Sequence, residues 1–323
     1  MKKIGKFFLV VILALVVFFF WASSSNYTNS DHTQLISYKD GLTSTNHDSI
    51  FSIATYNIGY LSGMTNNLPV DRTKSLFDEN LKKTKSVFKT IQADIIAFQE
   101  IDYDSKRSFN VNQQEALSSL GFSYAAQAVN WDVTYLPFPY WPISSHFGKT
   151  YSGQSILSKF EIKKHEVTVL SEPADMPFWR SAFYLDRLAQ VVTLTINGQE
   201  IKIINVHLEA FDQDARKKQT NEVNAIYHKY AGTYPTFLVG DFNSDMSAGD
   251  AVINKLLVSA NIAYAVIDTA QKTYPSDKPV ERLDYIFYNT NFIEKVDARI
   301  VTEIKEASDH LPVLMRFKLK PRY

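Results

Sequence analysis

Short apolar runs recur along this chain, and several of them end in a polar residue. Apolar runs of four to eight residues bounded by turn residues are typical of strands buried inside packed sheets. Asn197-Gly198 lies between two such runs and predicts a hairpin turn. The strand-like runs cover residues 50–57, 94–100, 153–157, 167–170, 189–196, 201–208, 236–239, 283–288, 298–301 and 313–319.

Three other segments have the spacing of helices. They cover residues 72–90, 113–120 and 212–230. The third begins with aspartates and ends with lysine and histidine, which complements the helix dipole. Many strands interspersed with a few helices predict a mixed α/β architecture in which one sheet packs on another.

The size and composition fit one large domain, which we expect to span residues 49–323. Of the 323 residues, 45% are hydrophobic, and 34 Lys and Arg balance 34 Asp and Glu. This balance disfavours a strongly basic nucleic-acid binder. The chain has no cysteine, which excludes disulfides, thiolate nucleophiles and zinc sites of the cysteine type. A cysteine-free exported protein favours a bacterial envelope over a eukaryotic secretory route.

Residues 1–22 are predicted to be a signal anchor or a signal peptide. Three lysines within the first six residues precede an unbroken apolar run over residues 7–22. The positive-inside rule then places the start of the chain in the cytoplasm and the large domain outside it. We expect the protein to reach the membrane through this segment.

Whether this segment is cleaved depends on the residues at its end. Ala22-Ser23-Ser24 supplies the small residues that a signal peptidase needs, whereas Trp21 suits an anchor at the membrane interface. We favour an uncleaved anchor, with a secreted protein as the alternative. Residues 23–48 are rich in Ser, Thr, Asn and Asp and are predicted to be a linker.

Polar residues at or near the ends of the apolar runs form a candidate site. Oxygen donors without thiolates select Mg²⁺, with Mn²⁺ or Ca²⁺ as alternatives. Two histidines, without a nucleophilic cysteine or a Gly-x-Ser-x-Gly elbow, favour direct attack by water. Taken singly, each residue is also explained as a cap, a turn residue or a core histidine. The set is Asn57, Glu100, His207, Asp241, Asn243, Asp284, Asp309 and His310.

In their order along the chain, these residues lie in six stretches that resemble the endonuclease/exonuclease/phosphatase superfamily. That superfamily includes DNase I, abasic-site endonucleases, inositol-polyphosphate 5-phosphatases and neutral sphingomyelinases. The resemblance implies a four-layer α/β sandwich of two packed mixed β-sheets flanked by helices. The stretches are Ala54-Thr55-Tyr56-Asn57, Phe98-Gln99-Glu100, Asn205-Val206-His207-Leu208, Gly240-Asp241-Phe242-Asn243, Arg282-Leu283-Asp284-Tyr285 and Ser308-Asp309-His310-Leu311-Pro312.

The resemblance also implies which residues hold a metal ion. Glu100 would bind it, Asn57 would lie beside Glu100, and Asp309 would lie next to the metal and the phosphate. A bound cation stabilises the charge on phosphate oxygens in the transition state.

The remaining five residues would carry out the acid–base chemistry. His310 resembles the general base of the family, oriented by Asp284. Asp241 would position or deprotonate the water, and Asn243 would hold a phosphate oxygen. His207 would donate to the phosphate or to the leaving oxygen.

The substrate is predicted less sharply than the chemistry. Residues 131–151 are rich in aromatic residues and contain three prolines, which predicts an ordered loop beside the site. Such a loop could stack on bases, enter a lipid headgroup layer, or pack as a small core of its own. Candidate substrate-binding residues are Trp141 and His146 in this loop, and Arg180 and Arg187 in a second cluster.

We expect an extracytoplasmic, divalent-metal-dependent phosphohydrolase. The favoured activity is that of a phosphodiesterase acting on a phospholipid headgroup or a similar phosphoester. A secreted or surface-anchored nuclease like DNase I is the first alternative, and an inactive binding module of the same fold is the second. No obligate protein partner is expected.

Overall fold

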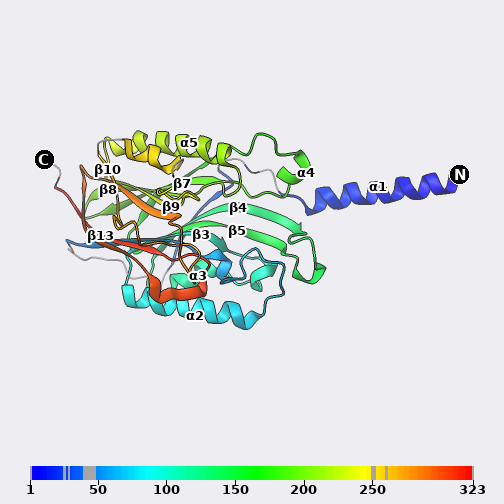
Figure 1. Ribbon diagram of the computed structural model, residues 1–323, viewed down its shortest axis with the longest axis horizontal. Helices are drawn as coiled ribbons and strands as arrows, with labels where there is room; N and C mark the ends of the chain where they lie inside the picture. The colour runs from blue at the N-terminus through cyan, green and yellow to red at the C-terminus, as the bar shows by residue number, and fades with distance from the viewer. Residues whose placement is uncertain are drawn as a thin grey trace.

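Two β-sheets pack face to face, and helices cover their outer faces (Figure 1). The computed structural model describes residues 2–24, 27, 30–38, 49–248, 252–258 and 261–321. The result is the predicted four-layer sandwich of two mixed sheets flanked by helices.

The first sheet has seven strands in the order β1-β4-β5-β3-β2-β13-β12. Its strands β2 and β3 run parallel, and the other neighbours are antiparallel. The strands are β1 (Thr33–Ser37), β2 (Phe51–Asn57), β3 (Ile95–Asp102), β4 (Tyr124–Leu136), β5 (Gly148–Ser158), β12 (Ile293–Ile300) and β13 (Val313–Leu319).

The second sheet has six strands in the order β10-β11-β9-β8-β7-β6. Its strands β8 and β9 run parallel, and the other neighbours are antiparallel. The strands are β6 (Ile162–Val169), β7 (Leu188–Ile196), β8 (Gln199–His207), β9 (Thr236–Asp241), β10 (Ile262–Tyr264) and β11 (Asp284–Asn289).

The three predicted helices are confirmed to within two residues at each end. Thr73, Asn112 and Asp212 cap their N-termini by accepting hydrogen bonds from backbone N–H groups three residues ahead. The α-helices are α1 (Lys2–Ala22), α2 (Lys74–Ile91), α3 (Gln113–Ser118), α4 (Phe178–Ser181) and α5 (Gln213–Ala231). Short 3-10 segments are η1 (Gly59–Leu61), η2 (Lys106–Ser108), η3 (Ile143–Ser145), η4 (Val252–Val258) and η5 (Thr302–Ala307).

The outer helices are fixed by their apolar faces. Phe77 and Phe88 of α2 pack on the first sheet, and Val223 and Tyr227 of α5 pack on the second. The side chains between the two sheets form the largest buried cluster. The sheets therefore cannot slide past each other without exposing this core.

Two segments differ from the sequence prediction. Thr33–Ser37, inside the predicted linker, forms the edge strand β1 and pairs with β4. Residues 39–48 of that linker lie outside the described residues. Both ends of the predicted aromatic loop are also strand, since β4 continues to Leu136 and β5 begins at Gly148. The prolines at 137, 139 and 142 lie just beyond the end of β4, where no ladder hydrogen bond is needed.

Candidate active site

The period-two alternation of the strands carries polar side chains to one edge of the interface between the sheets. We call the region that these side chains line the cleft. In β8, Ile201 and Ile203 belong to the core between the sheets. Asn205 continues this face, where it accepts a hydrogen bond from Gln99 of the opposite sheet at 2.6 Å. His207 is the next residue on the same face, at the end of the strand. Its position in the cleft therefore follows from the hydrophobic pattern of β8.

A bulge in β3 directs Glu100 into the same cleft. The pairing of β3 with β5 shifts register between Phe98 and Ile101, and Glu100 has a left-handed backbone with φ of 52°. Regular alternation would place Glu100 on the side of Phe98, which packs against Phe88 of α2. Instead its Oε1 accepts a hydrogen bond from Asn57 Nδ2 at 3.3 Å.

Amide side chains connect the carboxylates of the site. Asn57 Nδ2 also donates to Asp241 Oδ2 at 2.9 Å, so it bridges the two sheets. Asn66 Nδ2 donates to Glu100 Oε2 at 2.9 Å and lies 3.3 Å from Asp309 Oδ2. Glu100 follows Asn57 by 43 residues, and Asp309 follows Glu100 by 209 residues. Their side chains nevertheless lie in one small region.

His310 and His207 flank Asp241. His310 Nδ1 lies 2.9 Å from Asp284 Oδ2, and its Nε2 lies 3.7 Å from Asp241 Oδ2. His207 Nε2 lies 3.6 Å from the same oxygen. A carboxylate behind an imidazole fixes its tautomer and orientation. Asp284 therefore holds His310 with Nε2 directed toward the centre of the cleft.

Burial and charge give the two histidines opposite behaviour. Burial lowers the pKa of His207 well below its usual value, and the nearby charges of Arg187 and His310 lower it further. Burial alone would also lower the pKa of His310, but Asp284 and Asp241 outweigh it and hold that pKa well above the usual value. His207 is thus neutral and His310 is a cation at neutral pH.

The carboxylates are shifted mainly by burial. Burial raises the pKa of Asp241 to about 7, against the opposing effect of His310. Burial also raises the pKa of Glu100, and repulsion from Asp309 adds to it. A group of carboxylates with raised pKa values in a cleft is typical of a functional site.

Glu100 and Asp309 fit a divalent cation. Both offer hard oxygen atoms, and both are partly open to solvent. Among the described residues, no lysine or arginine forms an ion pair with either of them. The two neighbouring carboxylates receive hydrogen bonds from the amides of Asn57 and Asn66 and, at Asp309, from the Ser308 hydroxyl at 3.2 Å. These uncharged donors leave negative charge that a cation would neutralise.

A second group of ligand atoms has less room for an ion. Asp241, Asp284 and His310 each place one such atom within 4.8 Å of the others. However, His310 Nδ1 already pairs with Asp284 Oδ2, and all three side chains are buried. The Glu100 and Asp309 pair suits Mg²⁺ better, because Mg²⁺ keeps several waters and prefers oxygen ligands.

Close pairing of β9 with β8 requires glycine at position 240. Gly240 has φ of 137°, and a Cβ there would lie 1.9 Å from the Val206 carbonyl oxygen. Asp241 Oδ1 then accepts from the Asn243 backbone N–H at 2.9 Å, and Asn243 Nδ2 donates to the Leu208 carbonyl at 2.9 Å. Asn243 therefore ties the ends of β8 and β9 together beside Asp241.

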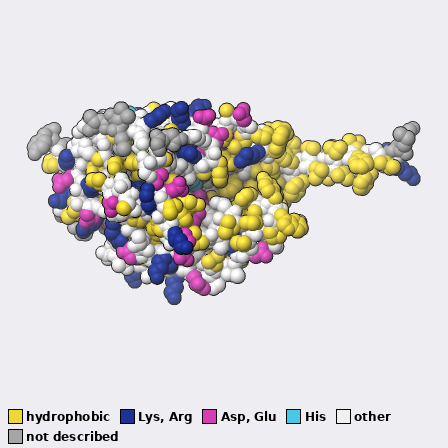
Figure 2. Space-filling view, viewed as in Figure 1, with side chains coloured by type: hydrophobic (Ala, Val, Ile, Leu, Met, Phe, Trp, Pro, Cys, Tyr) yellow, Lys and Arg dark blue, Asp and Glu magenta, His cyan; other side chains and the backbone are white. Residues whose placement is uncertain are grey.

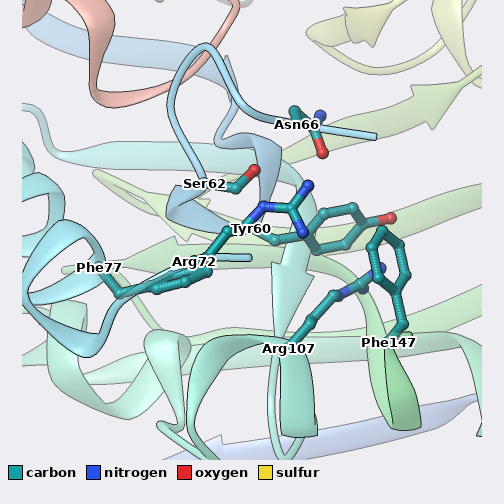
Figure 3. A pocket seen from close by; sticks show the side chains of 7 residues that line it. All are labelled: Tyr60, Ser62, Asn66, Arg72, Phe77, Arg107 and Phe147. Atoms are coloured by element: carbon teal, nitrogen blue, oxygen red, sulfur yellow. The ribbon is translucent and has the colours of Figure 1, made fainter. Parts of the chain in front are cut away.

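Tyr60, Arg107 and Phe147 line a small pocket together with Asn66, whose amide donates to Glu100 (Figure 3). The Arg107 guanidinium lies 3.3 Å from the centre of the Tyr60 ring and 4.9 Å from that of Phe147. Arg107 is buried and pairs with Asp102 through two nitrogens. Arg72 also lines the small pocket beside these rings. Sequence reasoning did not single out Arg107 or Arg72 as site residues. Arg107 lies on the 3-10 segment η2, and Arg72 lies two residues before the start of α2.

The eight predicted site residues converge on one cleft, whereas the four predicted substrate-binding residues do not form one group. Arg187 is buried near the cleft and pairs with Glu209 at 3.4 Å. His146 Nδ1 lies 2.7 Å from the Tyr135 hydroxyl. Trp141 and Arg180 are exposed. Substrate binding by these four residues stays a prediction.

Two further residues of the cleft were not predicted. Asn66 lies in an irregular loop after η1, and Tyr274 lies in another, with its ring centre 4.9 Å from that of His310. Neither residue follows an apolar run, so a search for polar residues at the ends of predicted strands does not find them. Their positions depend on tertiary contacts such as the bridge between Gly63 and Ser308.

A two-sheet sandwich with carboxylates, amides and two histidines in its cleft defines a class of phosphoester hydrolases. The model of the endonuclease/exonuclease/phosphatase family matches residues 54–310. This chain belongs to that family.

Curated relatives match part of the chain. The chain is 30% identical over 124 residues to UPF0294 proteins from two strains of Vibrio cholerae serotype O1. These matches cover 38% of this chain and 42% of each relative, so the chain spans less than half the length of the curated relatives it matches.

Solved structures share the fold at low sequence identity. A Beutenbergia cavernae endonuclease/exonuclease/phosphatase is 18% identical, with a TM-score of 0.60 over 84% of this chain and 72% of that one. The human Nocturnin catalytic domain with bound sulfate is 16% identical, with a TM-score of 0.59 over 91% of this chain and 100% of that one. A Bacteroides thetaiotaomicron mannosyl-6-phosphatase is 16% identical, with a TM-score of 0.57 over 84% and 99%.

Proposed function

We propose that this protein is an extracytoplasmic, divalent-metal-dependent phosphohydrolase that hydrolyses phosphodiesters by attack of water. The observation that supports this most is the convergence of the eight polar residues, brought from six separate elements into one cleft. Several carboxylates held together repel one another, and such clusters are typical of functional sites. The same completeness argues against an inactive binding module.

In this proposal the residues divide the work by position. Glu100 and Asp309, with Asn57 beside them, would hold Mg²⁺ or a similar cation. When bound, that cation would act as a Lewis acid toward the phosphate oxygens. Asp241 lies between both imidazoles and would position or deprotonate the attacking water.

The two histidines would act on the phosphate in different ways. His310, held by Asp284 and carrying its proton, would stabilise the developing charge by donating from Nε2. Asp241 is then the group that would accept the proton of the water. His207, which is neutral, would donate a hydrogen bond to a phosphate or leaving-group oxygen. Asn243 keeps Asp241 in place and would contact a phosphate oxygen through its remaining N–H.

The favoured substrate is a phospholipid headgroup or a similar phosphoester at a membrane. The support is the exposed aromatic side chains near the base of α1, the helix that is long and apolar enough to cross a membrane. A nuclease would be expected to place such rings along a basic groove instead. The anchor and the positive-inside rule together favour a domain outside the cytoplasm.

A substrate panel tests the proposal. The full chain in detergent is assayed on sphingomyelin, glycerophospholipids, phosphoinositides, DNA and RNA, each with and without EDTA. We expect hydrolysis of a lipid phosphodiester that EDTA abolishes and Mg²⁺ restores. Cleavage of DNA or RNA alone would favour the nuclease, and turnover that EDTA does not affect would contradict the metal-dependent mechanism.

A further inference from the structure

The catalytic end of the sandwich is also the end that holds α1. Asn57, Glu100, His207 and Asp241 all lie at or near the C-terminal ends of their strands. Strands β4 and β5 continue past this edge, since Trp131 and Asp102 both pair with Ser152. The remaining five residues of β4 extend the hairpin by about 17 Å at the usual rise per residue. Figure 1 shows α1 projecting from this end of the molecule.

The end of α1 is held firmly against this hairpin. Ala22 is fully buried, and Ser24 donates its backbone N–H to the Ala182 carbonyl at 2.8 Å. Ser24 also forms a bridge with Val133 of β4. In the last turns of the helix, Phe19 packs edge-on against Phe183, with ring centres 5.5 Å apart. The direction of α1 relative to the domain is therefore fixed by packing.

Large apolar side chains surround the base of α1 (Figure 2). They come from two separate segments, the loop after β4 and helix α4. Beneath the first segment, Val133, Leu136 and Phe147 form a small buried core that supports the loop. The outward side chains, which we call the aromatic rim, are Tyr140 (78% exposed), Trp141 (76%), Ile143 (64%), Phe178 (72%) and Trp179 (59%).

We propose that the aromatic rim docks into the interfacial layer of the bilayer that α1 crosses, so that the active-site cleft faces the membrane surface. This inference rests on the proposed anchoring by α1. Tryptophan and tyrosine prefer the boundary between headgroups and acyl chains. Five exposed apolar side chains grouped on one end would be costly in water but are stabilised at that boundary.

The fixed end of α1 determines which surface meets the lipid. A flexible tether would let the domain tumble, whereas the contacts of Ala22 and Ser24 leave the rim next to the membrane boundary. The hairpin overhang then places the cleft about 17 Å from the rim. A phosphoester that projects from the bilayer could reach this gap, while a long nucleic-acid duplex would meet the membrane.

Single-cysteine reporters test this docking directly, because the chain has no cysteine of its own. Ile143→Cys and Trp179→Cys place one reporter in each segment of the rim. Val296→Cys is the matched control, an exposed apolar residue at the bulge of β12. The part of β13 that pairs with its neighbours Lys295 and Asp297 also pairs with the start of β2. Each full-length variant is labelled with an environment-sensitive fluorophore and reconstituted into phosphatidylethanolamine and phosphatidylglycerol vesicles.

We expect spin-labelled lipids to quench the two rim reporters several-fold more than the control, and aqueous iodide to quench them several-fold less. If the protein sediments with the vesicles but iodide quenches the rim reporters as much as the control, the docking is wrong and the anchoring by α1 is not affected. A chain that does not sediment with vesicles would overturn both. Neither readout depends on hydrolysis, so failure of the enzymatic proposal would be seen separately in the substrate panel.

Discussion

Glu100 combines a left-handed backbone with a raised pKa, and both features have one origin. The bulge at Phe98–Ile101 turns the side chain into a buried cleft where Asp309 repels it. A non-glycine residue in this conformation costs about 1–3 kcal/mol and persists only when its surroundings hold it in place. Here the amides of Asn57 and Asn66 do so. The position of Glu100 therefore brings a negative charge into the site at a cost in stability.

Replacing Glu100 with glutamine tests whether its carboxylate binds the cation. In wild-type protein, Mg²⁺ at a hundredfold excess over Kd should stabilise the fold by about 2.7 kcal/mol, a rise of several degrees in Tm. Glu100→Gln keeps the shape but loses a ligand and the repulsion from Asp309, so it should lose this Mg²⁺ response. Differential scanning calorimetry with and without Mg²⁺ measures both. An equal Mg²⁺ shift in the variant would place the ion elsewhere.

Gly240 is the second residue whose backbone fixes the site. Gly240→Ala should destabilise the protein by at least about 3 kcal/mol, because the Cβ would overlap the Val206 carbonyl. Gly198→Ala is the control, since Gly198 also has positive φ but has open space around it. Urea unfolding compares the two. Equal, small losses in both variants would show that the close approach at Gly240 is unimportant.

The elements follow from the sequence to different degrees. The helices could be predicted because caps and periodicity agree at their ends, as at Thr73 and Asp212. Strand β4 could not, because Asn130 and Asp132 interrupt its apolar pattern and the prolines follow closely. Strand β1 is short and polar and forms only by adding to the edge of β4. The site was predictable where a residue ends a strand, as His207 does, and not where a loop supplies it, as with Asn66.

His165 on β6 has a different pKa in the folded and the unfolded protein. Burial lowers the pKa of His165 from 6.5 to about 4, and its Nε2 lies 3.1 Å from Gln190 Nε2. The unfolded chain binds this proton near pH 6.5 and the folded protein only near pH 4, so stability falls as pH drops through this window. Between pH 7 and pH 5 the loss from His165 should be about 2 kcal/mol.

Urea unfolding at the two pH values measures this loss. His165→Gln keeps a hydrogen-bonding group beside Gln190 but does not titrate, so its stability should fall less between pH 7 and pH 5 than that of the wild type. Identical pH dependence in the two proteins would mean that His165 takes up its proton without unfolding.

At the scale of the whole molecule, the membrane segment and the catalytic cleft share one end of the sandwich. The sequence indicated an anchor and a cleft separately, but their relative position depends on the strand register that joins Asp102, Ser152 and Trp131. No local pattern encodes that register. The contacts of Ala22 and Ser24 likewise arise only in the folded chain.

This arrangement predicts where the full chain is found in a bacterial cell. We expect it at full length in the membrane fraction, and protease added to spheroplasts should degrade the large domain. Immunoblotting of the fractions measures both. A soluble secreted product that begins near Ser23 would instead establish a cleaved signal peptide, and protection from external protease would contradict the proposed topology.

Active-site variants test whether the residues around Asp241 hydrolyse phosphoesters. Initial rates on the best substrate of the panel are compared for wild type, Asp241→Ala, His310→Ala and the control Asp214→Ala, which changes an exposed residue on α5. We expect each active-site variant to lose at least about a hundredfold in rate, with Asp214→Ala close to wild type. Full activity in folded Asp241→Ala or His310→Ala would show that hydrolysis does not depend on this site.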